Sequence, residues 1–173
     1  TSITQNVVNN TSYQYTNMGG IIGGVFSNLI LNHTLIEGNT VTGSNSLKGG
    51  IIALFYGSDF EMNNSTLGEN TISLGSGSYY DGEIIYIDQM EASITNSIIY
   101  DNTQYMPIKI RRSDLNAHHN LILGGQNAFG GDGDIIWGDG NINEDPQFVD
   151  PDSGNYQLQS TSPCIDTADP QSD

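Results

Sequence analysis

The sequence predicts an all-β fold, a parallel β-solenoid of about five turns, on three observations. First, Gly, Asn, Ser and Thr make up about 40% of the 173 residues, and these residue types disfavour helix. Second, 21 Ile and 9 Tyr supply the β-branched and aromatic side chains that packed strands need. Third, the chain repeats itself with a period of 23 to 32 residues, which suits one solenoid turn per repeat.

Three segments of the chain align with one another without forcing. Their equivalent asparagines, Asn39, Asn70 and Asn102, lie 31 and 32 residues apart. A weaker fourth copy follows, in which Leu121 comes 23 residues after Ile98. Because each copy shows two or three short apolar stretches and no helical pattern, we expect one copy to form one turn. The aligned segments are residues 29–39, 60–70, 92–102 and, for the fourth copy, 115–125.

Each copy is predicted to contain the same elements in the same order. A short apolar strand comes first, at 20–25, 50–54 and 83–87. Apolar residues then alternate with polar ones, which is typical of a strand with one buried face. A polar residue breaks the alternation and turns the chain through a corner, after which an adjacent pair of residues restarts the inward face. The alternating pairs are Leu29/Leu31, Phe60/Met62 and Ala92/Ile94, and the corner residues are His33, Asn64 and Asn96.

The equivalent asparagines at the end of each aligned segment are predicted to stack as a ladder. Asn tolerates left-handed backbone, and its amide can bond to the neighbours above and below. The alternative is that Asn39, Asn70 and Asn102 serve only as turn residues. The connections at 42–48 and 75–81 vary in length, so we expect them at one variable corner.

At this point the chain resembles a known family. Its repeated pattern, Gly-Gly-apolar-Ile, an alternating strand, Asn-Ser/Thr-Ile/Leu and then Gly/Asp-x-Asn, is similar to the right-handed parallel β-helix repeats of bacterial secreted and surface proteins. These include polymorphic outer-membrane proteins and pectate-lyase-like enzymes. The stretch GNINEDPQFVDP at 140–151, with NYQL at 155–158 and SPCID at 162–166, resembles the segment that ends such β-helices in surface-anchored proteins. The resemblance implies a right-handed, single-stranded parallel β-helix capped at its C-terminus.

We expect a single β-helix domain over residues 1–173, with rungs in 1–138 and a C-terminal cap in 139–173. A solenoid end exposes strand edges and an open core, which the cap would cover. The N-terminal residues read as a partial rung, so we expect the chain to be a piece of a longer protein. The residues expected to plug the core are Phe148, Tyr156, Leu158 and Ile165.

The net charge of −16 argues against nucleic acid and anionic membranes as partners, because the chain has no basic footprint. No run approaches 18 apolar residues, so we also expect no membrane insertion by this segment. The charge is uneven: residues 1–112 carry all four basic residues and a net −5, whereas residues 113–173 carry a net −11.

Acidic and amide side chains cluster at alternate positions after residue 130, a spacing that calcium loops favour. Glu144, however, stands where a helix-loop-helix calcium loop needs glycine, and a solvated acidic end is the other interpretation. The fold requires no cofactor, and Ca²⁺ is the cation that this pattern suggests. The candidate metal ligands are Asp132, Asp134, Asp139, Asn141 and Asn143.

Three of the four basic residues and two of the three histidines lie between 109 and 119. If Ile108 and Ile110 face inward, Lys109 and Arg111 project from one outer face. The resemblance implies a role for them, because β-helix polysaccharide lyases use Lys, Arg or His on such a face to neutralise a uronate and abstract its α-proton. The alternative is solvated side chains paired with nearby aspartates. The candidate catalytic residues are Lys109, Arg111 and His119.

Tyrosines on a flat solenoid face can stack on sugar rings, or they can simply cover the sheet. The candidates for sugar stacking are Tyr86, Tyr100 and Tyr105.

Two classes of function remain from the sequence. The favoured one is a secreted or cell-surface bacterial β-helix module with a structural, adhesive or carbohydrate-binding role, whose partner is a polysaccharide or another surface protein. The alternative is a polysaccharide lyase or glycoside hydrolase of the pectate-lyase-like type, acting on acidic polysaccharide. A groove that gathers Lys109, Arg111 and a histidine would favour the enzyme, and a smooth face would favour the module.

Overall fold

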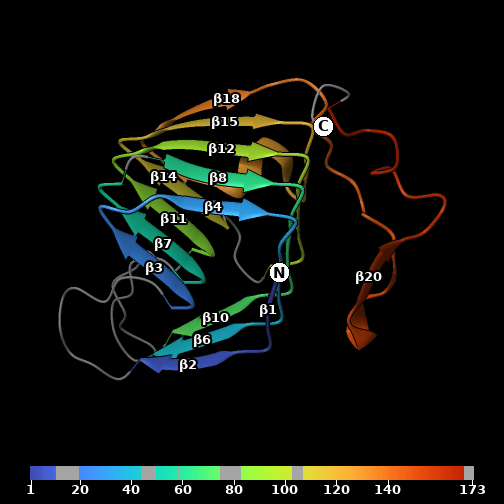
Figure 1. The fold of residues 1–173 in the computed structure, drawn as a ribbon, viewed down its shortest axis with the longest axis horizontal. Coiled ribbons are helices and arrows are strands. Elements are labelled where there is room, and N and C mark those ends of the chain that lie inside the picture. Colours follow the sequence, from blue (N-terminus) through green and yellow to red (C-terminus); the bar gives the residue numbers. More distant parts are fainter. Residues whose placement is uncertain (11–19, 44–49, 58, 75–82, 103–106, 170–173) are drawn as a thin grey trace.

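The computed structural model describes residues 1–10, 20–43, 50–57, 59–74, 83–102 and 107–169. Short strands make up most of this part of the chain, and they stack turn upon turn (Figure 1). Each strand of the stack pairs in parallel with the equivalent strand of the turn before or after it. The all-β class and the parallel solenoid stacking predicted from the repeat are therefore confirmed.

The chain visits four sheets in the same order, here called the first to the fourth sheet. The first three contain five strands each, in agreement with the five turns expected, and the fourth contains three. The first sheet holds β3 (Ile22–Val25), β7 (Ile52–Phe55), β11 (Ile85–Asp88), β14 (Ile108–Arg111) and β17 (Phe129–Gly131). The second holds β4 (Leu29–Asn32), β8 (Asp59–Asn63), β12 (Glu91–Thr95), β15 (Asp114–His118) and β18 (Asp134–Trp137).

The third and fourth sheets complete each turn. The first described strands, β1 and β2, belong to these two sheets only, so the chain starts with a partial turn as expected. The third sheet holds β1 (Ser2–Thr4), β5 (Leu35–Glu37), β9 (Thr66–Gly68), β13 (Ile98–Tyr100) and β16 (Leu121–Ile122). The fourth holds β2 (Val7–Asn10), β6 (Thr40–Gly43) and β10 (Thr71–Leu74).

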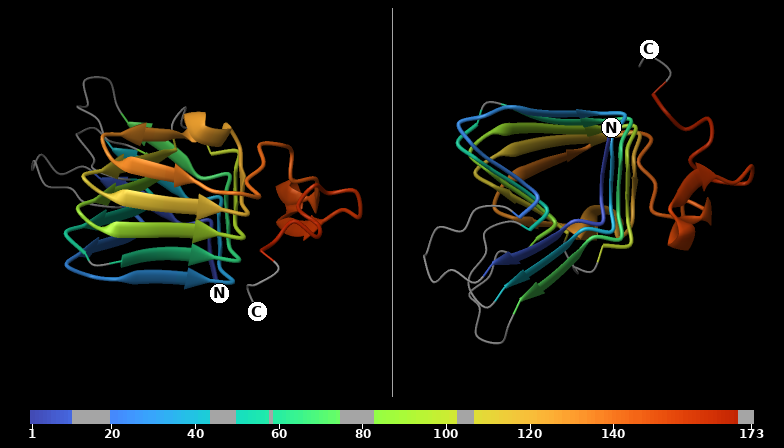
Figure 2. Two further views of the ribbon diagram at one scale, coloured as in Figure 1. Left: turned by 90° about the horizontal axis from the view of Figure 1, so that it is seen from above. Right: turned by 60° about the horizontal axis from the view of Figure 1, so that its bottom comes forward.

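The strand register is the one that the repeat alignment predicts. Phe60 pairs with Leu29 on one side and with Ala92 on the other, and Ile98 pairs with Leu121. Because neighbouring strands lie about 4.8 Å apart, equivalent residues of successive turns form columns. The stacked turns are seen from two further directions in Figure 2.

The inward-facing columns form one continuous apolar core. Ile108 and Ile110 are fully buried in it, as the sequence predicts, and so are the alternating residues of the second sheet. Full burial of such a side chain contributes about 1.5–3 kcal/mol, so the Ile-rich columns are the main source of stability. The central columns contain Ile52, Ile85 and Ile108; Leu54, Ile87 and Ile110; Met62, Ile94 and Ala117; and Ile36, Leu67, Ile99 and Ile122.

Three corners of the turn are made by single residues in left-handed backbone. Such a residue redirects the chain and interrupts the in–out alternation, which explains the polar breaks in the sequence pattern. The corner between the first and second sheets has Phe26 (φ 54°), Tyr56 (54°), Gln89 (60°) and Arg112 (47°). The next corner has His33 (48°), Asn64 (49°), Asn96 (50°) and His119 (56°), and the corner after the third sheet has Gln5, Gly38, Glu69 and Asp101 (44–61°).

The predicted asparagine ladder is present beside the third corner. The Asn39 amide donates to Asn70 Oδ1 at 3.0 Å, and the Asn70 amide donates to Asn102 Oδ1 at 3.2 Å. Asn6 extends the ladder by one turn, donating to Asn39 Oδ1 at 2.9 Å. A second, mixed ladder that the sequence did not predict follows the second corner. It runs through Thr34, Ser65, Ser97, Asn120 and Asn141.

The C-terminal segment forms an antiparallel hairpin of β19 (Phe148–Asp150) and β20 (Asn155–Leu158), joined by the 3₁₀ turn η2 (Pro151–Ser153). A second 3₁₀ turn, η1 (Gly125–Ala128), links the third sheet back to the first. The hairpin lies beside the stack of turns (Figure 1). Its apolar side chains pack on the outer face of the third sheet, in a cluster separate from the core.

The prediction that this segment plugs the core is therefore corrected. Phe148 contacts Tyr100 and Tyr156 edge-on, at ring-centroid distances of 5.2 and 5.1 Å, and Ile165 is 42% exposed. Instead, the last turn carries bulky rings at inward positions: Phe129 meets Trp137 edge-to-face at 5.8 Å. The boundary expected at residue 138 stays a prediction.

Candidate functional site

A row of carboxylates runs along the outer face of the second sheet. Asp59, Glu91, Asp114 and Asp134 occupy the first positions of four successive strands and are paired in register. Like charges placed directly opposite one another in a sheet are destabilising. The row therefore adds nothing to the stability of the fold, and it leaves a line of hydrogen-bond acceptors on one face.

An open groove lies where this row meets the first corner. Its volume is about 470 Å³, and Asp59, Glu91 and Asp114 line it together with Arg112. A smaller hollow of about 160 Å³ continues from it over the next positions of the second sheet, beside Glu61. The groove therefore combines several carboxylates with a single guanidinium group.

Arg112 is held at the groove by a buried partner. Its guanidinium donates to both oxygens of Asp88, at 2.6 to 2.9 Å, and Asp88 is only 2% exposed. The hydrogen bonds to this carboxylate raise the pKa of Arg112. Because the side chain of Arg112 is itself 48% exposed, its remaining N–H groups lie at the groove in a fixed orientation.

Two exposed aromatic rings stand at the corner on which the groove begins. Phe26 is 80% exposed and Tyr56 is 42% exposed, and their rings stack with a centroid distance of 5.7 Å and an interplanar angle of 30°. Both residues have left-handed backbone, which costs about 1–2 kcal/mol for a residue other than glycine. Neither ring gains much burial in return. We refer to these two rings, Arg112 and the carboxylates Asp59, Glu91 and Asp114 as the corner groove.

The sequence interpretation missed Phe26 and Tyr56, although the repeat carries a signal for them. Both follow the first strand of their turn, at equivalent positions of consecutive copies. Recognising them requires knowing that this position forms a corner, where a side chain points away from the core.

The structure places Lys109 and Arg111 on one outer face, as predicted, but His119 elsewhere. Lys109 Nζ lies 3.4 Å from Glu83 Oε1, and Arg111 donates to the Tyr86 hydroxyl at 3.4 Å. Burial raises the pKa of Glu83 and lowers the pKa of Lys109. His119 follows the far end of β15, so the three candidate catalytic residues do not share one site.

Two of the three tyrosines expected to stack on sugars are covered. Tyr86 is fully buried against Phe55, and Tyr100 is 9% exposed beneath the hairpin. The Tyr100 and Tyr156 hydroxyls donate to the two oxygens of Glu69, at 2.6 and 3.1 Å. The stacking prediction is thus corrected for Tyr86 and Tyr100, which stabilise the fold instead. Tyr105 lies outside the described residues.

The five residues expected to bind calcium are dispersed. Asn141 Oδ1 accepts from the backbone of Asn120 at 3.0 Å, and Asn143 Oδ1 accepts from the backbone of Gly124 at 2.8 Å, so these oxygens stabilise the last turn. Asp132 accepts from the backbone of Arg112, Asp134 ends the carboxylate row, and Asp139 carries the carbonyl that accepts from the backbone of His119. Among the described residues, these aspartates form no cluster of three ligand atoms within 4.8 Å.

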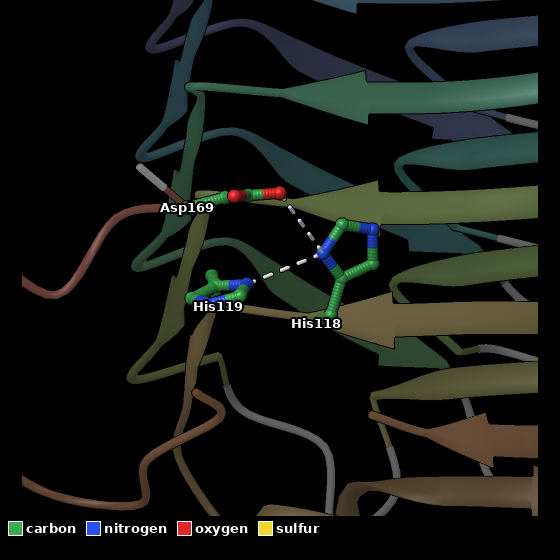
Figure 3. Close-up of side chains that lie close together, drawn as sticks. All are labelled: His118, His119 and Asp169. Atoms are coloured by element: carbon green, nitrogen blue, oxygen red, sulfur yellow. Dashed lines mark hydrogen bonds and ion pairs between the residues drawn. The ribbon is translucent and has the colours of Figure 1, made fainter. Parts of the chain in front are cut away.

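Such a cluster does form around the two adjacent histidines. His118, His119 and Asp169 each offer a ligand atom, and these atoms all lie within 4.8 Å of one another (Figure 3). Asp169 comes from the C-terminal tail, whose return to this corner the sequence did not predict. The residue that anchors it is Asn96, whose Oδ1 accepts from the Asp169 backbone N–H at 2.8 Å.

No family model, curated protein or solved structure matches the chain. Within the described ranges, the structure contains no helix of the length and apolarity needed to cross a membrane.

Proposed function

We propose that the protein is a secreted or cell-surface β-helix module that binds carbohydrate in the corner groove. The observation that carries this proposal is the exposed pair Phe26 and Tyr56, held in unfavourable backbone beside a row of carboxylates. Aromatic faces stack on the apolar faces of sugar rings, and carboxylates accept hydrogen bonds from sugar hydroxyls. The similarity of the repeats to those of bacterial surface and pectate-lyase-like β-helices supports the same assignment.

The charge of the corner groove favours a neutral polysaccharide. Three carboxylates face one guanidinium, and the whole chain carries a net −16. A uronate or sulfate polymer would be repelled by this face, whereas the hydroxyls of a neutral sugar would donate to Asp59, Glu91 and Asp114. Arg112 would accept no hydrogen bond and would instead donate to a ring or hydroxyl oxygen.

The proposal is tested by isothermal titration with neutral and acidic oligosaccharides. The variants are Phe26→Asn and Tyr56→Asn, because Asn removes the ring and tolerates left-handed backbone. Val149→Asn, at an exposed apolar residue of the hairpin, is the matched control. We expect each ring variant to weaken binding of a neutral oligosaccharide by about 1–3 kcal/mol, and the control to bind normally. Equal binding by all three variants would remove the corner groove from consideration.

A second candidate function is a polysaccharide lyase, and one observation favours it. Burial lowers the pKa of Lys109, the direction required of a catalytic base, and Arg111 lies on the same face. The matched variants are Lys109→Ala and Lys109→Arg, because Arg keeps the charge but cannot act as a base. Loss of unsaturated product in both variants would support this function. Absence of product from the wild-type protein on a panel of acidic polysaccharides would eliminate it.

A further inference from the structure

We propose that His118, His119 and Asp169 form a zinc-type metal site that fastens the C-terminal tail to the solenoid. The three ligand atoms come from two parts of the chain about 50 residues apart. They lie within 4.8 Å of one another, and all three residues are half-buried (Figure 3). The site is separate from the corner groove, since it lies at the opposite end of β15.

The corner backbone is what brings the two imidazoles together. Adjacent side chains of an extended strand point to opposite faces. His118 ends β15 on the outer face, and the left-handed conformation of His119 (φ 56°) interrupts the alternation at the next residue. The two Nδ1 atoms consequently lie 3.3 Å apart, with the rings nearly perpendicular at 84°.

This separation fits a tetrahedral metal centre. Two nitrogens bound at about 2.0–2.1 Å to one tetrahedral Zn²⁺ are about 3.4 Å apart. The third ligand, Asp169 Oδ2, lies 4.0 Å from His118 Nδ1, so a small movement of the tail would complete the set. Two imidazoles with one carboxylate favour zinc and its transition-metal neighbours over Ca²⁺ and Mg²⁺, which prefer oxygen ligands.

Neighbouring groups orient each ligand for this role. His118 Nε2 lies 3.1 Å from Thr95 Oγ1, so a proton on Nε2 can be donated there, leaving the Nδ1 lone pair for a metal. The His119 ring packs closely over Gly140, where a Cβ atom would come within 2.3 Å of the ring. Asp169 is fixed through its backbone N–H, which donates to Asn96 Oδ1.

The variants that test the site can be taken from the same columns of the preceding turn. Thr95 stands in register with His118, and Asn96 holds the corner position that His119 holds one turn later. His118→Thr and His119→Asn therefore remove the imidazoles while keeping side chains that this fold already accepts. His33→Asn is the matched control, because His33 occupies the same corner in an earlier turn.

Binding of Zn²⁺ to the full chain is measured by isothermal titration, with the melting temperature as a second readout. We expect one Zn²⁺ per chain, a raised melting temperature, and about tenfold or greater loss of affinity in His118→Thr, His119→Asn and Asp169→Asn. The His33→Asn control should bind as the wild type does. Hydrogen exchange of the Asp169 amide should slow on addition of Zn²⁺, because the metal holds the tail in place.

Three results would overturn the proposal. One is unchanged Zn²⁺ affinity when both His118 and His119 are replaced, since zinc would then bind the acidic surface. Another is unchanged affinity in Asp169→Asn, because the tail would not supply a ligand. The third is an equal rise in melting temperature with Ca²⁺, which would indicate a site made of oxygen ligands.

Discussion

Replacing Asn70 by Ala should destabilise the protein more than the same change at an exposed asparagine. Asn70 is fully buried at the centre of the asparagine ladder. Its Oδ1 accepts from the backbone N–H and the side-chain amide of Asn39, at 3.1 and 3.0 Å. Its Nδ2 donates to the carbonyls of Ile36 and Gly68 and to Asn102 Oδ1, at 2.9 to 3.2 Å.

The size of the effect follows from the partners that remain. In Asn70→Ala the Asn39 backbone N–H loses its acceptor while it stays buried, which costs about 1–3 kcal/mol. The Asn39 side chain retains the Ile3 carbonyl, and Asn102 Oδ1 retains the residue 70 backbone N–H, so these two groups lose less. About 1 kcal/mol for the remaining bonds brings the expected loss to about 3 kcal/mol.

The matched control is Asn63→Ala. Asn63 faces outward on β8, and its Nδ2 makes an exposed bond of 3.2 Å to Asn32 Oδ1. We expect this change to cost within about 0.5 kcal/mol. Urea unfolding followed by far-ultraviolet circular dichroism measures both values, provided that the slope m is unchanged. Equal losses for the two variants would refute the structural role given to the ladder.

Three further predictions concern backbone, pH and thiol reactivity. Gly131→Ala should cost at least about 3 kcal/mol in urea unfolding, because a Cβ there would lie 1.9 Å from a backbone carbonyl oxygen, whereas Gly154→Ala, with no atom within 4 Å, should cost about 1 kcal/mol; similar values would contradict this geometry. Burial raises the pKa of Tyr100 and Tyr156 above the ordinary value of 10.0, so their contribution to stability is complete below about pH 10 and is lost as the pH rises further. The free energy of unfolding should fall above about pH 10, less steeply in Tyr156→Phe, and an unchanged slope in that variant would argue against the assignment. Burial also raises the pKa of the Cys164 thiol, so a disulfide reagent should label it more slowly in the folded than in the urea-unfolded protein, and equal rates would contradict its placement.

The sequence predicts the solenoid well because the solenoid is built from local, repeated decisions. The alternation of Phe60 and Met62, the break at Asn64 and the spacing of Asn70 each report one step of a turn, and the register of every turn follows from aligning the copies. Stacking then requires no further information, since each turn contacts mainly its neighbours.

The C-terminal segment was predicted less well because its contacts are not repeated. Apolar residues such as Phe148 and Leu158 show that the segment packs on something, but the same pattern suits the end of the core and the outer face of the third sheet. The return of Asp169 to His118 joins residues with no shared pattern. Only the folded chain brings them together.

The candidate sites were predicted in part, for a related reason. In–out alternation correctly places Lys109 and Arg111 on one outer face, yet it does not tell whether an outward side chain is covered. Tyr86 points outward and is fully buried, whereas Phe26 is 80% exposed because it stands at a corner. Distinguishing the two requires the position of each residue within the turn.

Carbohydrate binding by the corner groove is tested most directly on an array of immobilised neutral and acidic glycans. The wild-type chain is compared there with the double variant Phe26→Asn/Tyr56→Asn, after circular dichroism has shown that both are folded. We predict that the wild type is retained by a set of neutral glycans and that the double variant is not. Retention of both proteins by the same glycans, or of neither by any glycan, would contradict the proposal.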